Sequence, residues 1–427
     1  MHAQPTVLRG AVLTFEASGD HRYVAHFTAD GAVAWGADGL ITEVAPWARF
    51  IQEQPRWAEC YVYRGAPGRV IMPGLIDAHL HFPQMNILGA FGSQLLEWLD
   101  THVFPAEARF AEKEYAAAMA ARFWPWLASH GTTASCVYSS SHDVATEALC
   151  AAAASAGARA IIGTVLMDRN GPADLLQPTA TALAAADQFL QRLKHHPRLE
   201  YALTPRFAPT CSVALLKGLG ALLKKHPGTA VQTHLAENHG EIAWVKELFP
   251  TARDYTDVYD AAGLLTPRTL LGHGIWLTDG ELARLAETRA VIVHCPVSNQ
   301  FLGSGAANLH RLRKAGVRVA LGSDIAGGNT LSMFQVMDAA AKTALSTGHG
   351  VAPLQWLGLA TAGNADALGW GQRMGRLAPG YEANVVVVNP GAAPEHQALE
   401  SLAATLVHRG DDRMVEATVV LGRWVFE

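Results

Sequence analysis

The stretch Ile71-Met-Pro-Gly-Leu-Ile-Asp-Ala-His-Leu-His-Phe-Pro-Gln84 decides the fold of this 427-residue chain and points to its chemistry. Its apolar run predicts a short buried strand that ends at His79 and His81. Side chains at positions i and i+2 of a strand point to the same face, so the two imidazoles project together. Two neutral imidazoles on one face can bind a divalent metal, zinc above all. An edge strand that carries two histidines by chance is the alternative, and the rest of the chain must decide.

The stretch opens a regular alternation of strand-like and helix-like segments through the centre of the chain. Strands are expected at 74–81, 131–140, 159–166, 200–207, 229–238, 269–276, 290–299 and 317–324. Helices are expected at 113–128, 143–156, 179–194, 212–225, 239–247, 279–287 and 307–315. Eight strands separated by helices predict an α/β fold of the (β/α)8 TIM-barrel type. A doubly wound open sheet is the alternative, but it would carry a glycine-rich phosphate loop after an early strand, and none is found.

The two ends of the chain have a different pattern. Short alternating segments such as Thr6–Phe15 precede the first barrel strand, and others such as Ala417–Val425 return near the C-terminus. Such segments predict strands, and the two ends of a domain often lie close together. We therefore expect a small β-sandwich domain built from residues 1–70 and 384–427, attached to a barrel of residues 71–383.

Composition and charge exclude several classes of protein. Half of the residues are hydrophobic, and the net charge is −5 without a basic cluster. Binding to nucleic acid or to a membrane surface is therefore not expected. The cysteines at positions 60, 136, 150, 211 and 295 form no Cys-x-x-Cys pair, which is typical of reduced thiols. With no evident signal peptide or membrane span, a cytoplasmic location is expected.

Further candidate residues lie at the ends of other expected strands. His234 is near the end of the fifth strand, with Glu237 three residues on; His273 is in the sixth, and Asp324 closes the eighth. In a barrel these strand ends face one pole, so the side chains converge with the two histidines of the first strand. Three histidines and one carboxylate make a mononuclear metal site with an open position for water.

Each of these residues also has an ordinary structural explanation. A lone strand-end histidine such as His273 is often a hydrogen-bonded core residue, and an aspartate before a loop, such as Asp324, is frequently a helix N-cap. Glu237 is equally compatible with a solvated loop. It is the joint placement of the residues that favours a metal site.

Other metal-site signatures are absent from the sequence. There is no His-Glu-x-x-His motif, and no His-x-Glu paired with the Pro-Cys-x-x-Cys of zinc-dependent cytidine deaminases. The fourth strand ends in Thr-Pro-Arg-Phe at 204–207 and offers no lysine. A binuclear site bridged by a carboxylated lysine is therefore not supported, and one metal ion is expected.

These motifs resemble those of the amidohydrolase superfamily. The resemblance is carried by Pro-Gly-Leu-Ile-Asp-Ala-His-Leu-His at 73–81, by the strand-end His234, His273 and Asp324, and by Gly-Arg-Leu-Ala-Pro-Gly-Tyr-Glu-Ala-Asn at 375–384. The last motif usually ends in Ala-Asp. Asn384 departs from it at a position of the β domain that does not bear on catalysis.

Within the superfamily, the chain resembles the guanine deaminase family along nearly its whole length. The shared segments are His-Phe-Pro-Gln (81–84), Gln-Leu-Leu-Glu-Trp-Leu (94–99), Phe-Pro-Ala-Glu (104–107), Leu-Met-Asp-Arg-Asn (166–170), Thr-Pro-Arg-Phe (204–207), His-Leu-Ala-Glu-Asn (234–238), His-Cys-Pro-Val-Ser-Asn (294–299) and Ser-Asp-Ile-Ala-Gly-Gly (323–328). The resemblance implies hydrolytic deamination of guanine to xanthine and ammonia, as in purine catabolism or salvage. A homodimer is expected for a protein of this class.

The resemblance also implies a role for individual residues. It implies one zinc ion per chain, held by His79, His81, His234 and Asp324. Glu237, Asp324 and His273 would be catalytic, and the purine would contact Gln84, Arg206 and Phe207 beside His81, His234, Glu237 and Asp324. The long excursion of residues 82–112 after the first strand is expected to close over the bound purine.

Two other functions stay open at this point. The same machinery can act on another aminated purine, a pyrimidine or a triazine. A barrel of this superfamily can also lose its ligands and serve as an interaction protein, although every expected ligand is present here.

Overall fold

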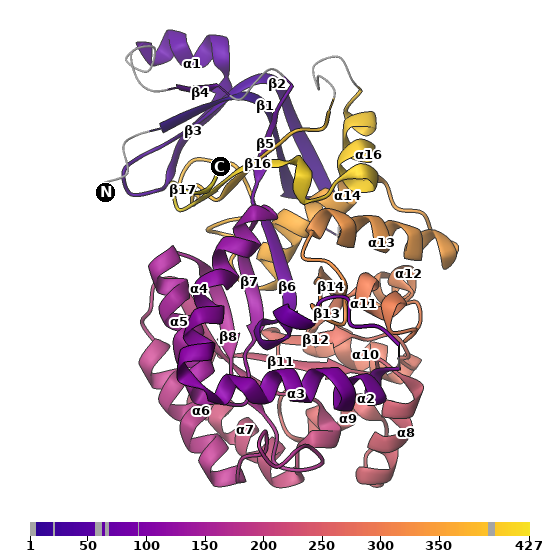
Figure 1. Cartoon of the computed structure of the whole chain (residues 1–427). Coiled ribbons are helices and arrows are strands. Elements are labelled where there is room, and N and C mark those ends of the chain that lie inside the picture. The colour runs from indigo at the N-terminus through magenta and orange to yellow at the C-terminus, as the bar shows by residue number, and fades with distance from the viewer. Residues whose placement is uncertain (1–5, 20–21, 56–61, 65–67, 93, 392–397) are drawn as a thin grey trace.

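The computed structural model describes residues 6–19, 22–55, 62–64, 68–92, 94–391 and 398–427. Its centre is a nearly closed barrel of parallel strands (Figure 1). In chain order these are β6 (Leu75–His81), β7 (Thr132–Tyr138), β8 (Arg159–Gly163), β10 (Leu199–Pro205), β11 (Ala230–Leu235), β12 (Thr269–His273), β13 (Val291–His294) and β14 (Arg318–Leu321), each paired with its neighbour, and the short β9 (Val165–Leu166) also pairs with β10. The expected (β/α)8 fold is confirmed.

The outside of the barrel is covered by helices that alternate with the strands (Figure 1). They are α4 (Lys113–Ser129), α5 (Asp143–Ala156), α6 (Thr179–Leu193), α7 (Val213–Lys225), α8 (His239–Leu248), α9 (Tyr255–Ala261), α10 (Asp279–Thr288), α11 (Pro296–Phe301), α12 (Leu309–Lys314) and α13 (Met333–Ser346), with a short 3₁₀ turn, η5 (Ala208–Thr210), after β10. Local signals set where they begin: the Ser212 hydroxyl caps α7, and a capping box of Thr278 and Glu281 opens α10. No described helix is long and apolar enough to cross a membrane.

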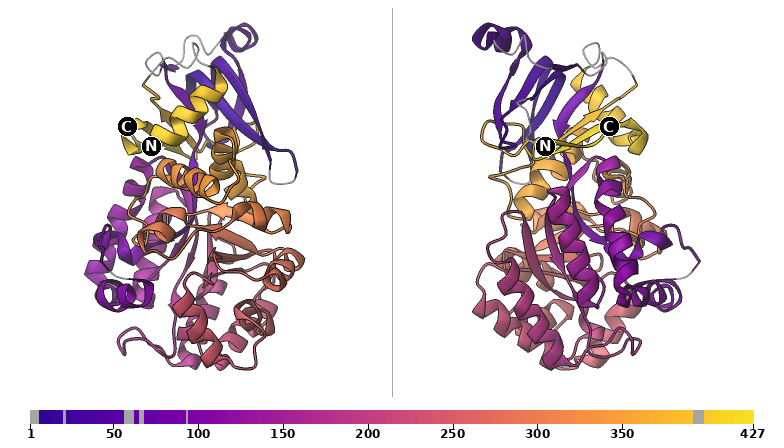
Figure 2. Two further views of the ribbon diagram at one scale, coloured as in Figure 1. Left: turned by 90° about the vertical axis from the view of Figure 1, so that its right-hand side faces the viewer. Right: turned by 60° about the vertical axis from the view of Figure 1, so that its left-hand side comes forward.

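A separate sheet is built from both ends of the chain. Its strands are β1 (Thr6–Ala17), β2 (Tyr23–Trp35), β3 (Ile41–Pro46), β4 (Val62–Arg64), β5 (Val70–Pro73), β15 (Val385–Val388), β16 (Val415–Val420) and β17 (Arg423–Phe426). The N-terminal and C-terminal strands meet where β5 pairs antiparallel with β15. Figure 2 shows the indigo N-terminal strands and the yellow C-terminal strands together at this end of the molecule. β5 runs past residue 70, so one strand of the terminal sheet crosses the domain boundary expected from sequence, and that boundary stays a prediction.

The remaining helices connect or flank the two sheets. They are α1 (Trp47–Glu53), α14 (Pro353–Gly358), the π-helical η6 (Leu359–Gly363), α15 (Asn364–Ala367), α16 (Leu399–Arg409) and the 3₁₀ turn η8 (Asp412–Met414). Trp370 and Met374, which follow α15, pack with barrel residues such as Ala78 and Ala202 in one buried cluster. The barrel therefore has a solid core below its strand ends, not a pore.

A buried ion network joins the two sheets at the beginning of the barrel strands. Glu382 pairs with Arg159, the first residue of β8, and with Arg198 just before β10, the latter over 2.7 Å. Asn384 donates its amide N–H to Glu382 over 3.0 Å and accepts from the backbone N–H of Leu421 over 2.8 Å. An aspartate could not donate to Glu382, so the amide suits this position.

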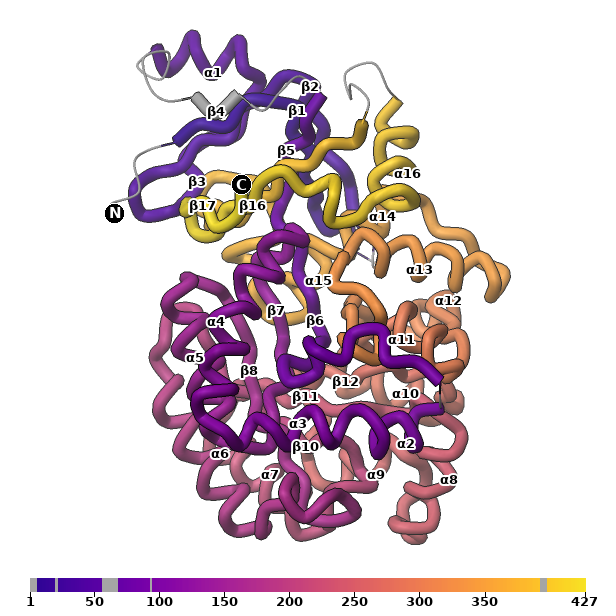
Figure 3. The backbone as a smooth tube through the Cα atoms, in the orientation of Figure 1, coloured from indigo at the N-terminus to yellow at the C-terminus, as the bar shows by residue number. Residues whose placement is uncertain are grey.

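The excursion after β6 consists of short helices. They are η2 (Phe82–Ile87), α2 (Leu95–Trp98), the π-helical η3 (Leu99–Val103), α3 (Phe104–Ala108) and η4 (Arg109–Ala111). Figure 3 shows α2 and α3 running across the barrel. Their apolar residues, Leu95, Trp98 and Phe104 among them, pack with Tyr138 of β7 and with Phe207 after β10 in one buried cluster. The excursion therefore lies against the carboxyl ends of the barrel strands.

Candidate active site

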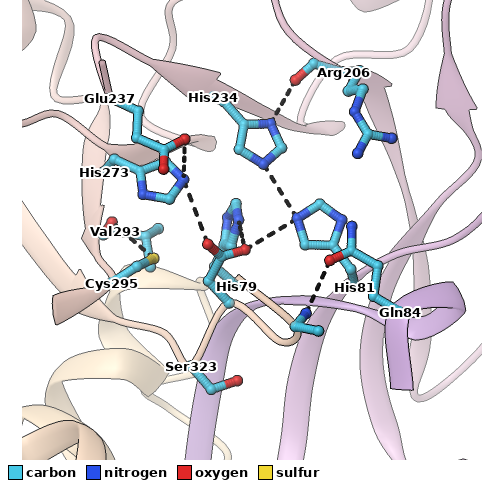
Figure 4. Close-up of polar contacts among 12 residues, drawn as sticks. His79, His81, Gln84, Arg206, His234, Glu237, His273, Val293, Cys295 and Ser323 are labelled. Carbon is cyan, nitrogen blue, oxygen red and sulfur yellow. Dashed lines mark hydrogen bonds and ion pairs between the residues drawn. The ribbon is translucent and has the colours of Figure 1, made fainter. Parts of the chain in front are cut away.

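The candidate metal ligands meet at the carboxyl ends of three barrel strands. His79 and His81 come from the end of β6 and His234 from β11 (Figure 4). Asp324 follows β14. One ligand atom from each residue lies within 4.8 Å of all the others. Nε2 of His79 and Nε2 of His81 are each 3.2 Å from Asp324 Oδ1. The Nε2 atoms of His81 and His234 are also 3.2 Å apart. The structure thus brings these four residues together.

The protonation states of this cluster suit a metal ion. Burial lowers the pKa of His79 and of His234, and it lowers the pKa of His81 to about 4. Burial works against ionisation of Asp324, but the interactions with His79 and His81 bring the pKa of Asp324 well below its usual value. The imidazoles are therefore neutral and the carboxyl group is ionised, as metal ligands must be.

The ring of His234 is oriented by the backbone. Its Nδ1 lies 2.6 Å from the carbonyl oxygen of Arg206. A carbonyl can only accept, so Nδ1 carries the hydrogen and Nε2 keeps its lone pair for the site. Three imidazole nitrogens and one carboxylate oxygen at this spacing are a donor set that could hold a divalent metal ion.

The space for His79 depends on two glycines. A Cβ on Gly272 of β12 would lie 2.6 Å from Cε1 of His79, and one on Gly322, after β14, would lie 2.7 Å from Cβ of His79. Atoms cannot approach so closely, and neither neighbour is the end of a flexible chain. The glycines that precede His273 and Asp324 along the chain therefore leave room for the ring of the first ligand.

The backbone at His273 and Asp324 is unusual. Their φ angles are +71° and +51°, in the left-handed region that residues with a side chain rarely adopt. Such conformations persist only when the surrounding structure imposes them, and they gather at functional sites. They turn both side chains toward the cluster.

Glu237 and His273 lie beside the four-residue cluster. Nε2 of His273 is 3.3 Å from Oε2 of Glu237 and 3.7 Å from Oδ2 of Asp324. The Ser304 hydroxyl donates to Oε1 of Glu237 over 3.1 Å. Burial, and next the negative charge of Asp324, raise the pKa of Glu237 to about 8. Glu237 therefore holds a proton at neutral pH, whereas Asp324 is ionised.

The turn that carries Glu237 is fixed by the start of α8. Asn238 is the N-cap of that helix and forms a capping box with Glu241. Oε2 of Glu241 accepts from the backbone N–H groups of Glu237 and Asn238, over 2.8 and 3.2 Å. The Tyr255 hydroxyl donates to Oε1 of Glu241 over 2.7 Å. The segment His-Leu-Ala-Glu-Asn thus contains the candidate ligand His234 and the N-cap Asn238, and the cap positions Glu237 between them.

The expected purine contacts line a pocket next to the cluster. Its walls contain Gln84, Arg206 and Phe207, the histidines, Glu237, Asp324 and, from the excursion after β6, Leu95, Trp98 and Leu99. The sequence singled out residues for metal binding, proton transfer and substrate contact. All of them except His79 therefore line this one pocket.

Three buried residues near the site were not singled out from the sequence. Asp77 accepts from the backbone N–H groups of His79 and Ser323, over 3.1 and 3.0 Å, and so ties β6 to the segment after β14. Glu107 pairs with Arg206 over 2.7 Å, and Ser304 contacts Glu237. A carboxylate within an apolar strand was a visible signal for Asp77. Ser304 offered none, because its role depends on how the loop after α11 folds back.

Comparison with known families agrees with this geometry. Residues 70–425 match the amidohydrolase family. The chain belongs to that family, and the resemblance stated from the sequence is confirmed.

The relatives narrow the comparison further. A guanine deaminase of Escherichia coli strain K12 is 40% identical over 367 residues, which cover 84% of this chain and 84% of that protein. The solved structure of an E. coli guanine deaminase superposes with a TM-score of 0.93 at 35% identity, covering 99% of both chains. A C. acetobutylicum guanine deaminase, solved with guanine in its active site, gives a TM-score of 0.89 at 28% identity, covering 99% of this chain and all of the other. The chain is thus similar to guanine deaminases over nearly its whole length.

Proposed function

We propose that this protein is a guanine deaminase, which converts guanine and water into xanthine and ammonia. One observation carries the proposal: a buried cluster of three histidines and an aspartate borders the same pocket as Glu237 and Arg206. The chain also shares 40% identity with a guanine deaminase.

The cluster fits one zinc ion per chain, with His79, His81, His234 and Asp324 as ligands. Zinc, when bound, lowers the pKa of a coordinated water to about 7 and so supplies a nucleophile at neutral pH. Asp324 has a different neighbour for each oxygen: Oδ1 faces His79 and His81, and Oδ2 faces His273. Asp324 can therefore serve as a ligand and still accept a proton.

Proton transfer follows from the opposite pKa shifts of two carboxyl groups. Asp324 is ionised and takes a proton from the attacking water. Glu237 is protonated and gives its proton to ring nitrogen N3 as the water oxygen bonds to C2. The proton is thus in place before negative charge builds on the ring. His273, beside both carboxyl groups, holds the water and stabilises the tetrahedral carbon's oxygen. Asp324 then gives the proton that it took from the water to the C2 amine, which leaves as ammonia. The proton of the C2 hydroxyl returns to Glu237 as the carbonyl of xanthine forms.

The pocket walls suit a purine with a carbonyl group. Phe207 offers a ring face, and Arg206 and Gln84 offer N–H donors. Adenine carries an amine at C6 instead of a carbonyl, so the N–H groups of Arg206 and Gln84 that face the ligand would meet a donor and remain without an acceptor. Such a mismatch costs on the order of 1–3 kcal/mol or more. Guanine should therefore be deaminated and adenine essentially not.

The test is to incubate the purified protein with guanine and to measure xanthine and ammonia together with bound metal. Adenine, cytosine and an aminotriazine form the comparison panel. Equal amounts of xanthine and ammonia from guanine support the proposal. Turnover of another member of the panel in preference to guanine would replace it with a different deaminase, and a metal-free, inactive protein would point to an interaction protein.

Two properties of the whole molecule also belong to the proposal. We place the protein in the cytoplasm, since Cys136, Cys150, Cys211 and Cys295 are all buried free thiols. We also propose a homodimer, which light scattering on the purified protein checks directly.

A further inference from the structure

We propose that Glu107 sets the selectivity of the pocket for a purine with a carbonyl at C6, by locking the Gln84 amide and the Arg206 guanidinium in one orientation. The inference rests on the proposed deamination of guanine and deepens it. Gln84 and Arg206 line the pocket, whereas Glu107 is not among the lining residues. Glu107 is therefore a positioning residue that acts through two others.

Glu107 lies fully buried at the meeting point of three segments. It comes from α3, and its side chain has no exposed surface. Its Oε2 binds Nη1 of Arg206, after β10, over 2.7 Å, and its Oε1 accepts from Nε2 of Gln84, in η2, over 3.0 Å. The Ser140 hydroxyl, after β7, donates to the Glu107 backbone carbonyl over 3.1 Å. The carboxylate is thus held firmly and has one oxygen for each partner.

These contacts leave the Gln84 amide only one orientation. Nε2 of Gln84 faces the Glu107 carboxylate, which can only accept. Oε1 of Gln84 accepts from the backbone N–H of Ala326 over 2.9 Å, a group that can only donate (Figure 4 shows Gln84 beside His81). A flipped amide would place oxygen against carboxylate and N–H against N–H. Both contacts would be repulsive.

The lock gathers hydrogen-bond donors at one end of the pocket. Nε2 of Gln84 and the guanidinium of Arg206 lie side by side because they bind the two oxygens of one carboxylate. The Gln84 oxygen points the other way, toward Ala326. Guanine presents a carbonyl oxygen at C6, which accepts hydrogen bonds, next to an N1–H group, which donates one. A pocket that recognises guanine therefore needs donors opposite C6 and an acceptor opposite N1. A 6-aminopurine presents the reverse order, an amine next to a bare N1.

Without a carboxylate at position 107, one of the two repulsive contacts that oppose a flipped Gln84 amide disappears, and only the contact with the Ala326 N–H still opposes the flip. In Glu107→Gln the new amide can accept from Arg206 through its oxygen and donate to a flipped Gln84 through its nitrogen. The flipped Gln84 then turns its oxygen toward the end of the pocket that holds the group on C6, where it can accept from an amine. Selectivity is the difference between the affinities for the two purines. Removing the repulsion between the Glu107 carboxylate and a flipped Gln84 oxygen is therefore enough to change the selectivity.

The experiment compares guanine with 2,6-diaminopurine, which keeps the C2 amine but has an amine at C6. We would measure kcat and KM for both compounds, and their Kd by calorimetry, with the unmodified protein, Glu107→Gln and Glu382→Gln. Glu382 is the matched control, since it too is a buried carboxylate that pairs with two guanidinium groups, but at the other end of the barrel strands.

The ratio of kcat/KM for guanine to kcat/KM for 2,6-diaminopurine should fall tenfold or more in Glu107→Gln. The ratio of the two Kd values should shift in the same direction, and Glu382→Gln should lower the melting temperature without changing either ratio. Ratios within twofold of the unmodified protein in Glu107→Gln would overturn the inference and leave Glu107 with a purely structural role. If Glu107→Gln does not fold, a double variant that combines Glu107→Gln with Arg206→Gln replaces it, because the double variant contains no buried cation without a partner. The reference for the double variant is then Arg206→Gln alone.

The same data separate this inference from the proposed function. An unmodified protein that does not deaminate guanine would contradict the proposed function, while the Kd ratios would still test Glu107. An active protein whose ratios are insensitive to position 107 would contradict only the inference.

Discussion

Replacing Glu237 by glutamine should abolish most of the activity and leave the metal in place. Glu237 is not one of the four clustered ligand residues, so the variant keeps the donor set. Glutamine also has the same shape as glutamate, and its carbonyl oxygen can accept from Ser304 as the carboxylate does. What is lost is the proton for N3. Positioned proton transfer is worth roughly 10²–10⁴-fold in rate, or about 3–5 kcal/mol of barrier.

The pH dependence of the reaction gives the same residue a second test. An acid must be protonated to act, so activity that depends on Glu237 is present at low pH and falls as pH rises through its pKa. Burial places that pKa at about 8, and a bound cation nearby moves it lower. The unmodified protein should therefore lose kcat on the alkaline side at or below about pH 8, whereas the small residual rate of Glu237→Gln should not show this decline.

The assay combines initial rates of xanthine formation with metal analysis of the same protein samples. Glu281→Gln is the matched control: Glu281 is also a buried carboxylate, but it caps α10 and binds Thr256, and it does not line the pocket. It should change stability more than kcat. A Glu237→Gln protein that keeps more than a tenth of the original kcat would refute the role of proton donor, and one that loses its metal would show that Glu237 is a ligand.

Three further outcomes are expected. His79→Ala should reduce bound zinc from about one equivalent to almost none, as measured by mass spectrometry of the metal, because the three remaining ligands no longer complete the donor set. Glu382→Gln should make the melting temperature depend less on pH in acid. Burial opposes ionisation of Glu382, but Arg159 and Arg198 hold its pKa below the ordinary 4.5. The ion pairs therefore stabilise the fold above that pH, and this stabilisation is lost as pH falls through the folded-state pKa. Amide hydrogen exchange over residues 95–108 should slow when a tight-binding purine analogue is added, and unchanged exchange there would exclude closure of this segment over the ligand.

The barrel and its cluster of ligands could be predicted because both depend on short-range patterns. Each strand is a run of apolar residues between helical segments, and a parallel barrel places every strand end at one pole whatever the loops do. His79, His234 and Asp324 were therefore expected together although they come from distant parts of the sequence.

Contacts made by loops and irregular helices could not be predicted in the same way. The partnership of Glu107 with Arg206 and Gln84 depends on how α2, η3 and α3 cross the barrel, and no periodicity in the sequence determines that path. The break between β5 and β6 is another example: Pro73 and Gly74 divide one apolar run, and the run then serves two sheets. Which of the two sheets each half joins depends on pairing with β15, more than 300 residues later in the chain.

The two glycines that border His79 have a consequence for engineering this barrel toward another substrate. A library that randomises β12 and the residues after β14 would consist mainly of proteins with a displaced first ligand, because every side chain at Gly272 or Gly322 meets His79. The face contributed by Leu95, Leu99 and Leu302 borders the same pocket, and none of these three residues belongs to the donor set. New specificities are therefore accessible through the excursion after β6 and the loop after α11, while the two glycine positions must remain unchanged.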